Sequence, residues 1–285
     1  MFDIINKYIY DSFNSIEQTK THSIDVFYPS QASCKNLITG QIEGTCARNI
    51  FYKTKGYQYT NPSSSQMIRK MRYGNKIEEY EIDQLKAMDI CVGNQTAFEI
   101  IYDTIKIKGK VDAIVKINDK FICLEYKSSG GYYFKKQVMG SIYNNGFPKI
   151  SNLMQAMIYL DAFKNHKVFP FTECILMYID REQCTTKEFN VQLADGYPVI
   201  DDDIYKGVHV KAIYERYKYL FKHLSLNILP PKDFRPKVDL SIAAKERDEG
   251  IITKAAYTRA ESVGYYTDTI CTFCNYKDLC IKEGK

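Results

Sequence analysis

Two carboxylates and one lysine near the middle of the chain have the residue types and spacing for hydrolytic chemistry. Asp112, Glu125 and Lys127 flank a short polar segment, within runs of alternating apolar and polar residues. Such runs predict β-strands, and a hairpin of two strands would bring these side chains to one face of a sheet. Adjacent carboxylates repel unless a cation lies between them, so the pattern favours a hard divalent metal.

The turn of this hairpin decides which residues face each other. If Asn118-Asp119 is a two-residue turn, Ile117 pairs with Lys120. Counting back then puts Asp112 opposite Glu125, with their Cβ atoms about 5 Å apart. In the same register, apolar side chains of both strands share the other face and form a predicted core. A change of one residue in the turn would separate the carboxylates.

A third carboxylate lies on the helix predicted before the hairpin. Ser63–Ser65 offer N-caps for this helix, which we expect to reach about Met88. Glu78 lies four residues after Gly74, on a face whose other positions are mostly apolar. We therefore expect Glu78, rather than Glu79 on a different face, to be the third metal ligand. A helix-edge ion pair with a nearby lysine is the structural alternative.

Two further segments have side chains suited to nucleic-acid contact. Gln155 and Tyr159 are four residues apart on the helix predicted from residue 151 to 163, so they share a face. A loop opened by Gly130-Gly131 offers stacking and phosphate contacts to a DNA strand through Tyr132, Tyr133, Lys135 and Lys136. The alternatives are a partly buried helix surface and a disordered surface loop.

These motifs, in this order, resemble those of the RecB-type branch of the PD-(D/E)XK nucleases. The resemblance rests on Gly109-Lys110-Val111-Asp112-Ala113-Ile114, Leu124-Glu125-Tyr126-Lys127, and Gln155 with Tyr159. In that branch a Gly-x-x-x-His helix precedes the hairpin, whereas here Gly74 is followed by Glu78, a carboxylate that suits Mg²⁺ or Mn²⁺. The resemblance implies a metal-dependent nuclease with Asp112, Glu125 and Lys127 as catalytic residues.

Four of the nine cysteines resemble a metal-binding set drawn from both ends of the chain. Cys271, Cys274 and Cys280 form a C-x2-C-x5-C group, and Cys46 stands alone near the N-terminus, with Cys34 as its competitor. This pattern is similar to that of iron-sulfur nucleases such as AddB nuclease domains and the fourth family of CRISPR-associated proteins. The resemblance implies a 4Fe-4S cluster that fastens the chain ends together, with tetrahedral Zn²⁺ as the alternative.

Composition places the chain among ordinary globular proteins. Its 285 residues are 45% hydrophobic and 26% charged, without a repeat or low-complexity tract. A net charge of +5 suits contact with a polyanion but equally suits ordinary solubility. No apolar stretch is long enough to span a bilayer, and no basic, apolar leader follows Met1. We therefore expect a cytoplasmic protein with no membrane partner.

The predicted elements form an α/β fold with a central mixed sheet flanked by helices, which resembles the core of restriction endonucleases. We expect one nuclease domain over residues 1–285, with a catalytic core at 64–195. Segments 30–60 and 265–285 are expected to join at the iron-sulfur cluster.

Cap residues and apolar periodicity predict the remaining elements. A serine N-cap favours a helix from Ser30 or Ser33 towards Gly44. Strands are expected over 172–179 and 187–192, and a long, polar-faced helix over 203–224. The tail from Pro230 to Cys271 is polar and charged.

The expected activity is that of a metal-dependent DNA nuclease, namely an exonuclease acting on DNA ends or single strands in recombination, repair or CRISPR spacer processing. Helicase, recombination or CRISPR proteins are possible partners, because no P-loop glycine pattern gives this chain a motor of its own. The alternative is a nucleic-acid-binding adaptor with the same fold and metal cluster but little cutting activity. Intact Asp112, Glu125 and Lys127 favour the enzyme. The sequence predicts no oligomeric state.

Overall fold

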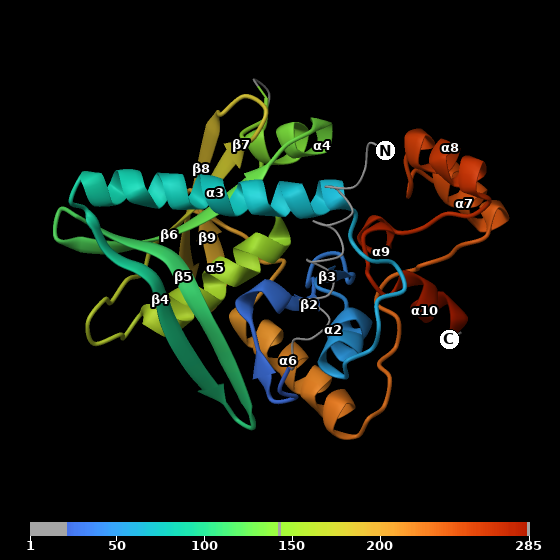
Figure 1. The fold of residues 1–285 in the computed structure, drawn as a ribbon, viewed down its shortest axis with the longest axis horizontal. Helices are drawn as coiled ribbons and strands as arrows, with labels where there is room; N and C mark the ends of the chain where they lie inside the picture. Colours follow the sequence, from blue (N-terminus) through green and yellow to red (C-terminus); the bar gives the residue numbers. More distant parts are fainter. Residues whose placement is uncertain (1–21, 142–143, 284–285) are drawn as a thin grey trace, which may run out of the picture. The chain divides into compact units, whose positions relative to one another are not determined.

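The computed structural model describes residues 22–141 and 144–283 (Figure 1). The chain divides into two compact units. Unit 1 contains Cys46–Ile68 and the residues from His223 onward, and unit 2 contains Ile24–Thr45 and Arg69–Lys222. Among the described helices, none combines the length and the apolar character needed to cross a membrane.

A mixed sheet of eight strands forms the centre of unit 2. Its strands are β1 (Val26–Phe27), β4 (Cys91–Tyr102), β5 (Ile105–Ile117), β6 (Lys120–Ser129), β7 (Cys174–Asp180), β8 (Thr186–Ala194), β9 (Tyr197–Ile200) and β10 (Asp203–Ile204). The order is β1-β5-β6-β7-β8-β9-β10, and β4 pairs with β5. The pairs β1–β5 and β6–β7 are parallel, and the other neighbours are antiparallel. This sheet, flanked by helices, confirms the predicted fold class.

The hairpin of β5 and β6 has the predicted register. Ile117 pairs with Lys120 around Asn118-Asp119, whose φ angles are 49° and 62°. Positive φ at both central residues is the geometry of a type I′ turn, whose twist matches that of the flanking strands. Continued one pair beyond the ladder, the same register sets Asp112 opposite Glu125.

Two helices cover opposite faces of the sheet. Helix α3 (Ser65–Ala87), which lies across the strands in Figure 1, packs Ile82 into a core cluster with Leu124 of β6. Helix α5 (Ile150–Phe163) provides the crossover between the parallel strands β6 and β7. Because successive strand residues point to opposite faces, Glu125 points away from the α3 core and towards α5.

The predicted loop from Gly130 to Lys136 is largely helical in the structure. It forms α4 (Tyr132–Phe134) and the π-helical segment η2 (Lys135–Met139). Phe134 and Val138 are four residues apart and both are buried. This helical spacing of two apolar anchors accounts for the departure from an open loop.

The helix predicted from Ser30 or Ser33 to Gly44 is wrong. These residues form the 3-10 turn η1 (Pro29–Gln31) and an antiparallel pair, β2 (Ser33–Lys35) with β3 (Ile42–Gly44). Gly40 and Gly44 have φ angles of 71° and 89°, which end any helix and let the chain reverse. A serine N-cap is insufficient without apolar residues at helical spacing behind it.

The long helix predicted over 203–224 begins later. Helix α6 spans Val210–Ser225, because Asp201-Asp202 have φ angles of 46° and 75° and turn the chain from β9 into β10. The backbone N–H of Lys211 donates to Nδ1 of His209 at 3.0 Å, which caps the start of α6. Strands β4 and β9 lack an apolar alternation strong enough to predict.

Unit 1 joins α2 to the C-terminal part of the chain. Its helices are α2 (Ala47–Thr54), α7 (Leu240–Asp248), α8 (Lys254–Val263), α9 (Thr269–Thr272) and α10 (Lys277–Lys282). The backbone N–H of Ala47 donates to Asp233 at 2.6 Å, and the buried Arg48 donates to the Pro230 carbonyl at 2.8 Å. The tail from Pro230 is therefore partly helical and tied to residues near the N-terminus.

A close approach fixes α3 over the end of β6. A Cβ added to Gly74 would lie 2.9 Å from Oγ of Ser128, and no other non-local atom would lie within 4 Å. We expect Gly74→Ala alone to be neutral or destabilising, because the gain in helix propensity, about 1 kcal/mol, is offset by this contact. The double variant Gly74→Ala/Ser128→Ala removes the contact and should exceed the wild type in free energy of unfolding.

Urea unfolding of the four proteins in this cycle, including Ser128→Ala alone, measures the coupling between the two positions. The expected coupling is favourable in the double variant. Strict additivity of the two substitutions would show that α3 does not rest on β6 at this point.

Candidate active site

The structure brings Asp112, Glu125 and Lys127 together on neighbouring strands. Oδ2 of Asp112 accepts a hydrogen bond from the backbone N–H of Tyr126 at 3.0 Å, so the carboxylate of β5 reaches β6. The ammonium of Lys127 donates to Oε1 of Glu125. Glu125 is 1% exposed, whereas the Lys127 side chain is 26% exposed. The site therefore has a buried acid and a lysine that reaches solvent.

Burial sets the protonation of this group. Burial is the main cause that raises the pKa of Glu125 to about 8. The nearby charge of Asp112 also raises this pKa, and the charge of Lys127 lowers it. Burial also raises the pKa of Asp112, against the lowering effects of Lys127 and of the Tyr126 backbone N–H. Burial disfavours the charge of Lys127, but the two carboxylates outweigh it and raise the lysine pKa. When both carboxyls are ionised, one ammonium leaves one negative charge uncompensated, and a bound divalent cation would favour that ionised state.

One carboxylate oxygen of this group lacks a hydrogen-bond partner among the described residues. Oε2 of Glu125 is buried and has no hydrogen-bond partner in the described part of the chain. A buried carboxylate oxygen without a hydrogen-bond partner destabilises the folded state, and coordination of a hard divalent cation would compensate it. Among residues 22–141 and 144–283, no three His, Cys, Asp or Glu side chains form a group that could hold a metal ion. Mg²⁺ commonly uses one or two carboxylates and completes its shell with water and phosphate, so Asp112 and Glu125 fit it.

Glu78 lies at the margin of the carboxylate group. Burial, followed by the charge of Asp112, raises the pKa of Glu78 to about 7, and Lys127 opposes this effect. Glu79 instead pairs with Lys76 at 2.5 Å, and both of these side chains are more than half exposed. The helix therefore directs Glu78, and not Glu79, towards the site. Its role as third ligand remains a prediction.

Gln95 is a site residue that the sequence did not reveal. Its Nε2 donates to Oε1 of Glu78 at 3.0 Å, and its hydrogen bond with Asp112 lowers the pKa of that carboxyl. The pairing of β4 with β5 places Gln95 opposite Asp112, and its φ angle is 49° within the strand. A non-glycine residue in this conformation is held there by its surroundings. The polar interruption Gly93-Asn94-Gln95 in the strand is the signal that could have indicated it.

Gln155 and Tyr159 complete the α5 side of the site. Nε2 of Gln155 donates to Oε1 of Glu125 at 2.7 Å and to the Tyr159 hydroxyl at 2.6 Å. Tyr159 is 2% exposed, and its ring meets Phe98 with centroids 5.6 Å apart. In this geometry Gln155 orients Glu125 and Tyr159 orients Gln155. Contact of either residue with DNA remains a prediction.

The predicted aromatic and basic segment is less uniform than its sequence indicated. Tyr132 is 71% exposed, and Lys136 is also exposed. Lys135 pairs with Glu182 at 2.9 Å and lies 3.5 Å from Asp180, so its charge is already compensated. The side chain of Tyr133 lies outside the described residues. Contact of this segment with DNA remains a prediction.

The four predicted cysteine ligands all belong to unit 1, and none of the nine cysteines is in a disulfide. Burial, with the charges of Cys46, Cys274 and Cys280 among the further causes, raises the pKa of Cys271, so the four thiols neighbour one another. The side-chain amide of Asn49 donates to Sγ of Cys274 at 3.4 Å, and Arg48 donates to Sγ of Cys280 at 3.7 Å. Donors of this kind stabilise thiolates. In the described ranges, however, no three Cys, His, Asp or Glu side chains are arranged to hold a metal ion, so the cysteine cluster remains a prediction.

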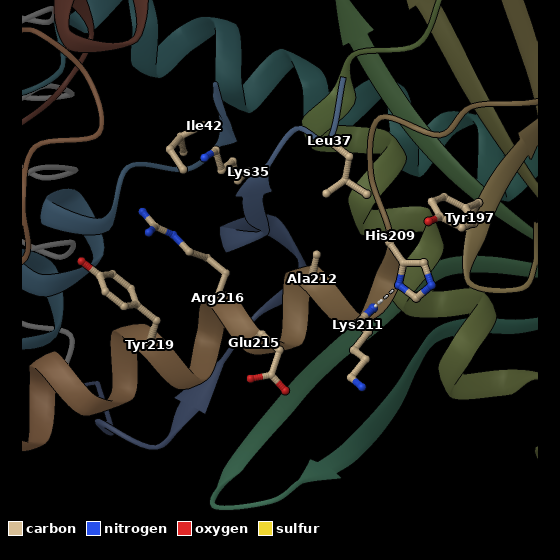
Figure 2. A pocket seen from close by; sticks show the side chains of 10 residues that line it. All are labelled: Lys35, Leu37, Ile42, Tyr197, His209, Lys211, Ala212, Glu215, Arg216 and Tyr219. Carbon is tan, nitrogen blue, oxygen red and sulfur yellow. Dashed lines mark hydrogen bonds between the residues drawn. The ribbon is translucent and has the colours of Figure 1, made fainter. Parts of the chain in front are cut away.

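A groove of about 630 Å³ lies elsewhere on unit 2. Figure 2 shows it along α6, where Arg216 and Tyr219 line one end and Tyr197 and His209 the other. Its lining includes none of Asp112, Glu125, Lys127 or the predicted DNA contacts. The carboxylate group is therefore identified by its chemistry and not by the volume of a cavity.

Comparison with known proteins agrees with this geometry. Residues 53–281 match the family model described as the PD-(D/E)XK nuclease superfamily. No curated protein matches the chain. Among solved structures, the "Crystal structure of SSO0001" is 17% identical, with a TM-score of 0.44, covering 79% of this chain and 86% of that chain. Because the family model spans most of the sequence, including the strands that bear Asp112, Glu125 and Lys127, the chain belongs to the PD-(D/E)XK nuclease superfamily.

Proposed function

We propose that this protein is a metal-dependent deoxyribonuclease, an exonuclease that hydrolyses phosphodiester bonds at DNA ends or in single strands. The observation that supports it best is the Asp112–Glu125–Lys127 group, with one buried carboxylate oxygen that lacks a hydrogen-bond partner. Membership of the nuclease superfamily supports hydrolysis of a phosphodiester. The net charge of +5 and the exposed Tyr132 support a nucleic-acid substrate.

The residues of the chain have separable tasks in this reaction. A bound Mg²⁺ or Mn²⁺ would polarise the phosphate and lower the pKa of an attacking water. Asp112 and Glu125 would hold that ion, and Gln155 keeps Glu125 in one orientation through its 2.7 Å hydrogen bond. Lys127, the partly buried cation of the group, would orient water and stabilise the negative charge that develops on the phosphate. Gln95 links Glu78 to this arrangement.

Removal of the metal or of its ligands should abolish cutting. Purified protein should degrade a labelled single-stranded DNA in Mg²⁺ or Mn²⁺ and lose this activity in excess EDTA. Asp112→Asn, Glu125→Gln and Lys127→Met should each lower the rate by about 10²-fold or more, because each removes charge from the reacting centre. Gel analysis of product lengths over time measures the rate and distinguishes trimming from ends from internal cuts.

Lys116→Met is the matched control for Lys127→Met, because Lys116 lies on the same hairpin and pairs with Asp119 at the turn. Its activity should equal that of the wild type. Full activity of Asp112→Asn would refute the proposed site. Tight DNA binding without cutting in any divalent cation would instead support the adaptor function.

The two neighbouring glutamates of α3 should differ sharply. Glu78→Gln should lower activity by about 10-fold or more, because Glu78 accepts a hydrogen bond from Gln95 and lies close enough to Asp112 to interact with its charge. Glu79→Gln should change activity less than about twofold, because it removes only an exposed ion pair with Lys76. Steady-state rates at several Mn²⁺ concentrations make the comparison. Equal effects, or the reverse order, would exclude Glu78 as a ligand.

We also propose that Cys46, Cys271, Cys274 and Cys280 bind one 4Fe-4S cluster, with zinc as the alternative, and that its role is structural. Two observations support this proposal. The four thiols neighbour one another in unit 1, and Arg48 and Asn49 donate to two of the sulfurs. Ligands from distant parts of the chain close a long loop, which favours the folded state.

Replacement of Cys46 or Cys274 by Ser should reduce the amount of bound metal and lower the melting temperature. The rate of DNA cutting per folded molecule should change much less. Cys184→Ser is the control, because Cys184 is exposed and lies in unit 2. Iron, acid-labile sulfide and zinc are measured on protein purified without oxygen. Stoichiometric zinc without iron would replace the cluster by a zinc site, and absence of both metals would exclude either.

A further inference from the structure

Two cations near the carboxylate group have no anionic partner in the part of the chain that the structure describes. They are Lys149, which precedes α5, and Arg181, which follows β7. Their surroundings connect them to the site through Tyr178, which pairs with Lys127 in the register of β6 and β7. The Tyr178 hydroxyl accepts hydrogen bonds from the backbone N–H of Lys149 at 3.0 Å and from Asn152 at 2.9 Å.

The ammonium of Lys149 lies over an aromatic ring. Its Nζ lies 5.9 Å from the ring centroid of Phe134, whose ring in turn lies 6.0 Å from that of Tyr178. Desolvation by these neighbours, and then the positive charge of Arg181, lowers the pKa of Lys149. Lys149 contacts the Tyr178 hydroxyl and Arg181 contacts Ser129, two residues after the Lys127 that pairs with Tyr178, so both cations belong to the same end of β6 and β7.

Arg181 makes two hydrogen bonds to backbone carbonyls. Its Nη1 donates to the carbonyl of Lys70 in α3 at 2.9 Å, and its own N–H donates to Ser129 at the end of β6 at 2.8 Å. Within the described residues, no carboxylate pairs with Lys149 or with Arg181. The adjacent Lys135 differs, because Glu182 and Asp180 compensate its charge.

Two neighbouring cations without an anion store repulsion that a phosphate would relieve. Ion pairs with Glu182 and Asp180 compensate the nearby Lys135, whereas no described carboxylate compensates Lys149 or Arg181. The phosphate group is also the anion that a nuclease site must hold on both sides of the bond it cuts. An arginine and a lysine together suit this ligand, because the guanidinium offers a planar pair of donors and the ammonium a point charge.

We propose that Lys149 and Arg181 form a binding site for a backbone phosphate of the DNA strand, next to the phosphate that faces Glu125 and Lys127. This inference rests on the proposed nuclease function for the identity of the strand. In this proposal Lys149 and Arg181, and not Lys135, bind the phosphate of the substrate.

Titration of a fluorescein-labelled oligodeoxythymidine, by fluorescence anisotropy in Ca²⁺ and at several salt concentrations, tests the site. The strand is checked for integrity after each titration. Lys149→Gln and Arg181→Gln should each weaken binding about 10-fold, and the double variant should reduce the slope of log Kd against log salt by about 1.4. Arg181→Lys should recover part of the loss, because it retains the charge.

The double variant Lys116→Gln/Lys164→Gln is the matched control. It removes two positive charges from unit 2, but from lysines that pair with Asp119 at 2.9 Å and with Asp161 at 2.7 Å. Its affinity and salt slope should equal those of the wild type. An equal loss in this control would show a general charge effect and overturn the site.

Neutral methylphosphonate linkages, placed one at a time in the oligonucleotide, distinguish a strand phosphate from a free one. At one linkage, the substitution should weaken the wild type and leave the double variant unaffected. Competition by millimolar inorganic phosphate with no effect of any linkage would overturn the inference. If the Lys149 and Arg181 variants bind and cut DNA as the wild type does, the phosphate site is refuted and the nuclease function is not. If binding depends on both cations but no divalent metal supports cutting, the nuclease function is refuted and the phosphate site is not.

Discussion

The burial of Glu125 on a central strand is the constraint on which the site depends. A carboxylate with 1% exposure needs compensation, and side chains of two elements, β6 and α5, provide part of it. Lys127 of the same strand and Gln155 of α5 both donate to Oε1, while Oε2 has no hydrogen-bond partner among the residues that the structure describes. One oxygen is therefore compensated and the other is not, and a divalent cation is the partner that a metal-assisted hydrolysis would supply.

The same constraint explains why the sheet is mixed at this point. The β5–β6 hairpin sets Asp112 opposite Glu125, and only an antiparallel neighbour with a short turn gives that pairing locally. The parallel β6–β7 pair then places Tyr178 beside Lys127 and brings the start of α5 to the site. The carboxylates, Lys127 and Tyr178 thus lie on neighbouring strands, and α3 packs on the opposite face with a close approach at Gly74.

The sequence was sufficient where local geometry decides, and insufficient where distant segments meet. A two-residue turn and a period of two determine the hairpin register, so the Asp112–Glu125 pair was predictable. The conformation of Gln95 depends on β5 beside it, and the compensation of Lys135 depends on Glu182, which is far away in sequence. The helix expected before Gly44 failed for the same reason, since the pairing of β2 with β3 outweighs a single cap residue.

The division of the chain into units implies an order of folding during synthesis. The residues of unit 2 are all made once the ribosome reaches Lys222, whereas unit 1 needs Cys46–Ile68 together with the segment that begins at His223. Domains commonly fold as units while the chain emerges. The eight-stranded sheet can therefore form before Cys271 has been synthesised. At that stage the nascent chain contains Asp112, Glu125 and Lys127 but not the complete set of four cysteines.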